Sequence, residues 1–86
     1  MHELSLASEI CRIAETHAGP AGAAAIREVA VDVGDTSGVE PESLTFCLEV
    51  LLSQPPFAAA RPRLFRLSGD ELRVRYVEVD DGRPDH

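Results

Sequence analysis

The stretch IREVAVDVGDTSGVEPESLTFCLEVL, residues 26–51, decides the fold because a strand signal in it is followed closely by a helix signal. Valines occupy every second position from 29 to 33, and this period of two with β-branched residues predicts a strand over Ile26–Val33. The residues GDTSG at 34–38 then predict a turn, because they are small, polar and rich in glycine.

A helix is predicted to follow that turn. Pro41 suits a first helical position, and Glu40 and Glu42 favour the positive end of a helix dipole. Apolar residues then recur at helical spacing, with Phe46, Val50 and Leu52 widening a stripe of Leu44, Cys47, Leu48 and Leu51. Gln54-Pro55-Pro56 ends the predicted helix.

Outward from this stretch, one more helix and two more strands are predicted. Apolar side chains spaced by three and four, from Leu4 to Ala14, predict a helix over residues 4–17, which Gly19-Pro20 ends. Strands are predicted over residues 63–67 and 72–79, with a turn at Ser68-Gly69-Asp70 between them. The tight turn predicts that these two strands pair as an antiparallel hairpin, and the strand at 26–33 is free to run parallel to one of them.

The element order α-β-α-β-β predicts an α+β domain of two layers, with two helices packed on a three-stranded mixed sheet. The chain has 86 residues, which fits one small domain. We expect this domain to span residues 1–80 and residues 81–86 to form a flexible tail.

Composition excludes several functions. Eight basic residues stand against 15 acidic ones, a net charge of −7, which argues against a nucleic-acid partner. Arginines gather between positions 61 and 75, but acidic residues interleave with them. No apolar run is long enough to span a membrane, and the N-terminus has no secretory signal pattern, so we expect a cytoplasmic chain without a membrane partner.

The cysteines and the missing motifs narrow the chemistry. Cys11 and Cys47 fall on apolar helical positions and are interpreted as two buried, free thiols, although sequence leaves a disulfide open. The sequence has no Cys-x-x-Cys pair for zinc and no phosphate-binding glycine loop. His17 suits a helix end and His86 a solvated tail, so no nucleophile–base–acid set is predicted and an enzyme is not expected.

Met1-His2-Glu3 can chelate a metal ion. The α-amine, the His2 amide nitrogen and the His2 imidazole would form a five-membered and a six-membered ring around one cation. A planar set of nitrogen ligands suits Ni(II) or Cu(II), and the Glu3 amide or carboxylate, water or a partner would take the fourth position. Binding must displace protons, so it should strengthen as pH rises. A histidine at position 2 of an exposed terminus often has no metal-binding role, so the pattern by itself does not establish a metal site.

Three stretches resemble one family. The opening MHELSLASEI, residues 26–51 and the end SGDELRVRYVEVD at 68–80 are similar, in the same order, to the HypA/HybF family of nickel-insertion proteins for nickel-iron hydrogenases. The resemblance implies two helices on a three-stranded sheet and a transient Ni(II) ion bound by the α-amine of Met1, His2 and Glu3. It also implies delivery to the hydrogenase large subunit, often with the GTPase HypB.

One departure from the family stands out. Family members carry a zinc ribbon with two Cys-x-x-Cys pairs inserted before the last strand, whereas residues 63–67 here run directly into Ser68-Gly69-Asp70. We therefore expect a short form without structural zinc. The leading hypothesis is a nickel metallochaperone for hydrogenase maturation. The alternative is a metal-independent adaptor that binds other maturation proteins, and a small hydrolase or isomerase is the least favoured reading.

Overall fold

A computed structural model describes residues 3–80 of the chain. The helices and strands are α1 (Glu3–Ala18), β1 (Ile26–Gly34), α2 (Pro41–Leu52), β2 (Arg61–Leu67) and β3 (Leu72–Val79). This order confirms the prediction, with two short 3-10 turns between α1 and β1 and two further residues at the start of β2. Residues 81–86, predicted to be a flexible tail, lie outside the described residues.

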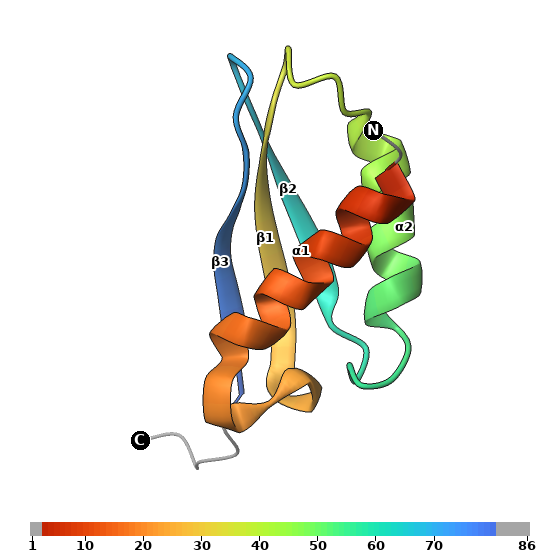
Figure 1. Ribbon diagram of the computed structural model, residues 1–86, viewed down its shortest axis with the longest axis vertical. Helices are drawn as coiled ribbons and strands as arrows, with labels where there is room; N and C mark the ends of the chain where they lie inside the picture. Colours follow the sequence, from red (N-terminus) through yellow and green to blue (C-terminus); the bar gives the residue numbers. More distant parts are fainter. Residues whose placement is uncertain (1–2, 81–86) are drawn as a thin grey trace.

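The sheet is mixed, as predicted, but its strand order is β2-β1-β3 (Figure 1). Strand β1 runs parallel to β2 and antiparallel to β3. The predicted hairpin is therefore wrong, because β1 lies between the two strands expected to pair. Strand β1 is buried along nearly all its length, and the central position gives it hydrogen-bonding partners on both edges.

The link between β2 and β3 crosses over the end of β1. The backbone N–H of Gly34 donates to the Glu71 carbonyl at 2.7 Å, and the next two residues donate to the Leu67 and Gly69 carbonyls at 2.8 Å each. A Cβ atom on Gly34 would lie 2.3 Å from the Gly69 carbonyl oxygen. The crossing therefore requires glycine at the end of β1.

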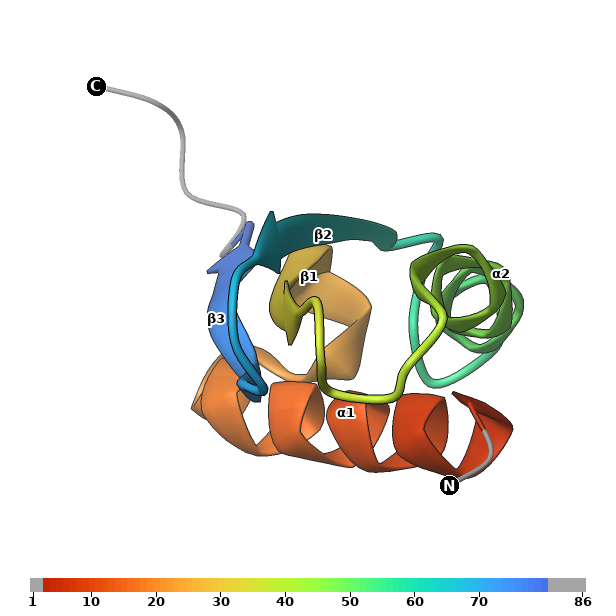
Figure 2. The ribbon, with the colours of Figure 1, turned by 90° about the horizontal axis from the view of Figure 1, so that it is seen from above.

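Both helices lie on one side of the sheet (Figure 2). The hydrophobic core fills the space between the helices and the sheet. Strand β1 directs Val31 and other aliphatic side chains into this core. Helix α2 supplies one line of leucines spaced by four, and α1 adds small residues that let it pack closely. Fully buried side chains of the core include Ala7, Ala14, Ile26, Val29, Val31, Leu44, Leu48 and Leu52.

The apolar stripe of α2 is narrower than its sequence suggests. Leu44, Leu48 and Leu52 are fully buried, whereas Phe46 is 65% exposed and Val50 is 38% exposed. The helix contacts α1 and β2 along one face, so two of the three residues expected to widen the stripe, Phe46 and Val50, are exposed to solvent, whereas the third, Leu52, is buried. Among residues 3–80, no helix is long and apolar enough to cross a bilayer.

Candidate metal centre

Helix α1 begins at Glu3, and of the predicted ligands only Glu3 is described; Met1 and His2 lie outside the described residues. Glu3 is half-buried, and its carboxylate accepts a hydrogen bond from the backbone N–H of Glu40 at 3.4 Å. This contact joins the start of α1 to the start of α2, which the ribbon shows side by side (Figure 1).

The start of α2 collects carboxylates for a local reason. Glu40 has an extended backbone, with φ −86° and ψ 116°, and Pro41 opens the helix behind it. The hydroxyl of Ser43 donates to a Glu40 carboxylate oxygen at 2.9 Å, and Glu42 lies in the first turn. Negative side chains are favoured there because the helix dipole is positive at this end. With Glu3, three carboxylates therefore border one place.

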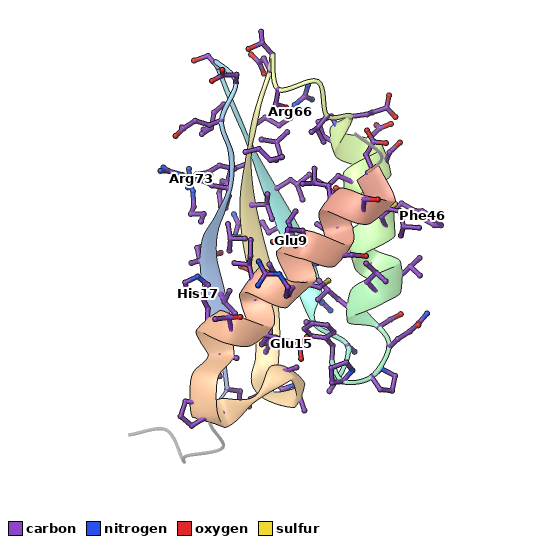
Figure 3. The ribbon with its side chains drawn as sticks, viewed as in Figure 1. Glu9, Glu15, His17, Phe46, Arg66 and Arg73 are labelled. Atoms are coloured by element: carbon purple, nitrogen blue, oxygen red, sulfur yellow. The ribbon has the colours of Figure 1, made fainter. Side chains whose placement is uncertain are left out.

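These carboxylates line an open surface hollow of about 520 Å³. Its apolar part comes from Leu4 and Phe46, both largely exposed, and Phe46 projects from α2 away from the body of the molecule (Figure 3). The full lining is Glu3, Leu4, Glu40, Glu42, Ser43, Phe46 and Cys47. The hollow thus combines an acidic rim with exposed apolar surface at the start of α1.

The described residues do not by themselves make a metal site. Among residues 3–80, no group of three or more histidine, cysteine or carboxylate side chains could hold a metal ion. Carboxylate oxygens suit hard cations, whereas Ni(II) prefers imidazole and other nitrogen ligands. Nickel at the hollow would therefore need nitrogen donors from Met1 and His2, so the chelate of Met1, His2 and Glu3 stays a prediction.

The other predicted residues lie apart from the hollow. His17 lies in the last turn of α1, the helix-end position predicted for it, about 21 Å from Glu3 along the helix axis. His86 lies outside the described residues. Cys11 is a buried free thiol, as predicted, and burial, followed by the nearby charge of Glu15, raises the pKa of this thiol to about 11. Cys47 is also free, but it is half-buried and borders the hollow.

Sequence reasoning missed the neighbours of Glu3. In the sequence, Glu40 and Pro41 indicate only a helix start, and the apolar character of Phe46 predicts burial in the core. The meeting of Glu3 with Glu40 depends on how α1 packs against α2, and no local pattern carries that information. The one available signal was the excess of carboxylates over basic residues at both helix starts.

Comparison with a solved structure supports the fold class. The chain superimposes on the solution structure of the Ni metallochaperone HypA from Helicobacter pylori with a TM-score of 0.60. The match covers 88% of this chain and 72% of that one at 19% identity, which shows a shared fold. The two helices on a mixed three-stranded sheet thus form the same fold as in that protein.

Sequence comparison identifies the family. Residues 1–64 match the family described as hydrogenase/urease nickel incorporation, metallochaperone, hypA, and the chain belongs to the HypA family. A hydrogenase maturation factor HypA from Streptomyces avermitilis is 43% identical over 120 residues, covering 96% of this chain and 90% of the relative. Another from Azoarcus sp. is 44% identical over 52 residues, which are 60% of this chain and 46% of the relative.

The chain is shorter than its relatives. It spans about half the length of several of them, with 46% covered in Azoarcus, 53% in Parabacteroides distasonis and 45% in Dechloromonas aromatica. The alignments with the Streptomyces relative and with one from Rhodopseudomonas palustris run over 120 and 113 residues, more than the 86 of this chain. Both relatives therefore contain residues with no counterpart here.

Proposed function

We propose that this chain is a nickel carrier for the maturation of a nickel-iron hydrogenase, with Ni(II) as its cargo. The α-amine of Met1, the amide and imidazole of His2, and Glu3 hold the ion. The observation that carries the proposal is the acidic hollow at the start of α1, bordered by Glu3 and Glu40, in a chain of the HypA family.

The hollow supports a transfer role on physical grounds. Carboxylates near the bound ion lower its energy electrostatically while leaving the ligand set incomplete, so a partner's ligand can enter. Exposed Leu4 and Phe46 beside them offer apolar surface to a docking protein. The partners proposed from family resemblance are a HypB-like GTPase and the hydrogenase large subunit. The chain performs no covalent chemistry in this role, and structural zinc is not part of it.

Nickel titration of the full chain with its native N-terminus tests the site. We expect one Ni(II) ion to bind with the absorption spectrum of a planar nitrogen complex, and His2→Ala to abolish that spectrum. His17→Ala is the matched control, because this histidine lies at the far end of α1, and it should bind nickel like the unaltered chain. Equal titrations for His2→Ala and the unaltered chain would remove the site.

The alternative is an adaptor that binds maturation proteins without metal, and the exposed Phe46 favours it. The two functions differ in their dependence on nickel. In a pull-down with the GTPase and the hydrogenase large subunit, a carrier shows partner binding that depends on nickel, and this binding is lost in His2→Ala. An adaptor keeps partner binding in His2→Ala and after chelation, and loses it in Phe46→Ser.

A further inference from the structure

One side of the sheet faces away from the helices (Figure 2). Long side chains of β2 and β3 lie on this side. On β1, Ala30 and Asp32 belong to this face, yet both are fully buried. Side chains of the two edge strands cover them, and the residues in register with these two positions are Arg63, Phe65, Arg73 and Tyr76.

An irregularity in β3 brings a further arginine to this face. Ala30 pairs with Tyr76 and the next residue, Val31, pairs with Val74, so Arg75 is an extra residue in β3. A β-bulge of this kind re-aims side chains. Arg75 and Tyr76 consequently both make contacts on the outer face, Arg75 with Asp32 and Tyr76 through its hydroxyl with Glu28.

Asp32 holds two arginines at once. One carboxylate oxygen accepts from the Nε of Arg75 at 2.6 Å, and the other accepts from the Nε of Arg73 at 3.0 Å. Burial raises the pKa of Asp32, but the hydrogen bonds from Arg73 and Arg75 outweigh burial and hold that pKa below its ordinary value of 3.8. The carboxylate is thus charged at neutral pH. It accepts one hydrogen bond from the Nε atom of each guanidinium.

Phe65 orients a third arginine beside them. The guanidinium carbons of Arg75 and Arg63 lie over the Phe65 ring, 4.0 Å and 5.0 Å from its centroid. Guanidinium groups interact favourably with aromatic faces, so the same ring favours the observed positions of both. We call Arg63, Arg73 and Arg75, with Asp32 and Phe65, the arginine cluster.

The arginine cluster leaves donors available. The side chains of Arg73 and Arg75 are 63% and 40% exposed although each makes an ion pair with Asp32. Glu71 lies 3.6 Å from a terminal nitrogen of Arg73, and among residues 3–80 no carboxylate forms an ion pair with Arg63. Arg63 interacts with Tyr76, whose hydroxyl donates to Glu28 on the same face. The three guanidiniums therefore lie near three carboxylates, Asp32, Glu71 and Glu28, and their ion pairs are with Asp32 and Glu71.

We propose that the arginine cluster is a docking site for an acidic segment of a partner protein, whose carboxylates bind the terminal nitrogens of Arg63, Arg73 and Arg75. The buried carboxylate of Asp32 is a positioning residue: it fixes two guanidiniums by their Nε atoms and leaves their terminal nitrogens for other partners, although Glu71 lies near one of those of Arg73. Guanidinium nitrogens match carboxylate geometry, which makes the site selective for acidic side chains.

A long polyanion fits this surface less well than a short acidic segment. Nucleic-acid binding depends on many cations that neutralise successive phosphates. Here the cluster is small, and β1 and β3 continue into acidic residues, Glu28 and Glu78, which lie opposite each other beyond it. A short carboxylate-bearing segment reaches the arginines without meeting that pair. This inference is independent of the nickel site, because it uses the opposite side of the sheet.

Binding of a fluorescein-labelled hexaglutamate amide to the full chain tests the site, with hexaglutamine amide as the uncharged control. Bulk charge alone would repel hexaglutamate from a protein of net charge −7, so binding at low salt requires a local site. Arg63→Gln should weaken binding by about tenfold. Arg12→Gln is the matched control, since Arg12 pairs with Glu9 on the exposed side of α1, and it should change nothing.

Asp32→Asn distinguishes positioning from simple electrostatics. It removes a negative charge, so it would tighten binding if charge alone mattered, whereas loss of the positioned guanidiniums should weaken it severalfold. Circular dichroism confirms that each variant is folded, and amide chemical shifts of the unaltered chain should move at the arginine cluster. Absence of hexaglutamate binding, shifts confined to α1 and α2, or preferential binding of an oligouridylate would overturn the proposal.

Discussion

The crossing of the β2–β3 link over β1 makes Gly34→Ala a sharp test of the strand order. The added Cβ would lie 2.3 Å from the Gly69 carbonyl oxygen and 2.7 Å from the Glu71 nitrogen. An ordinary carbon–oxygen contact is ~3.3 Å, so the link must retreat by about 1 Å. That movement strains the three backbone hydrogen bonds, of 2.7–2.8 Å, which tie the link to the end of β1.

The size of the expected loss in stability follows from those contacts. Overpacking costs about 1–3 kcal/mol, and each weakened hydrogen bond adds up to ~1 kcal/mol, so we expect a loss of about 2–4 kcal/mol in the free energy of unfolding. Each 1 kcal/mol lowers the melting temperature of a domain this size by ~4–8 °C. Urea and thermal unfolding, followed by circular dichroism, would measure both quantities.

The sign of the effect discriminates between strand orders. Without the crossing, alanine in place of a strand glycine would stabilise the chain by ~0.4–1 kcal/mol, because it restricts the unfolded state. Gly38→Ala is the control: nothing lies within 4 Å of its added Cβ, and its φ of +83° predicts a loss of ~1–2 kcal/mol from backbone strain alone. An unchanged or raised urea midpoint for Gly34→Ala would refute the crossing.

Three further predictions concern the core, the buried carboxylate and the thiols. Leu48→Ala, in the fully buried line of α2, should cost ~2–5 kcal/mol in urea unfolding, against less than ~1 kcal/mol for Val50→Ala; equal costs would contradict the observed face of α2. The folded-state pKa of Asp32 is depressed, so its stabilising effect is present above its ordinary value of 3.8 and is lost as pH falls below it; acid unfolding of Asp32→Asn should show a shallower dependence there, and an unaltered slope would count against the ion pairs. In a thiol-disulfide dye assay of the native protein at pH 8, half-buried Cys47 should react first and Cys11 only on unfolding, because burial raises the Cys11 pKa to about 11; two equally fast thiols would show that Cys11 is accessible.

The elements were predictable from sequence because their signals are local. Valines at every second position of β1 and leucines spaced by four in α2 each report one face of one element, and the structure confirms both. Strand order depends on contacts between distant residues. The link between β2 and β3 has four residues. A link of this length can join two neighbouring strands as a hairpin, and it can also cross one strand that lies between them, as it does here. Buried central strands are often continuously apolar, but Arg27, Glu28 and Asp32 interrupt β1, so its composition did not mark the central position.

The metal ligands of the candidate site stay a prediction, and the surroundings of Glu3 could not be predicted from the sequence. The family resemblance pointed to Met1, His2 and Glu3, which all fall at one end of the chain. The approach of Glu40 to Glu3 needs the packing of α1 on α2, and no sequence pattern reports that packing because the two residues are 37 positions apart. Phe46 was misplaced for a related reason: its apolar character predicts burial, but the position faces away from α1 and β2.

The two proposed surfaces should act independently, because the sheet and the core separate them. The hollow lies at the start of α1 and α2, whereas Arg63 and the rest of the arginine cluster lie on the sheet face away from both helices. At physiological salt the Debye length is ~8 Å, so a bound acidic segment should alter nickel affinity by less than about twofold. Nickel titration at saturating hexaglutamate measures this directly. A larger change that survives at 0.5 M salt would mean that the sites communicate through the fold, and β1, which ends at Gly34 and leads through residues 35–39 to Glu40, would be the connecting element.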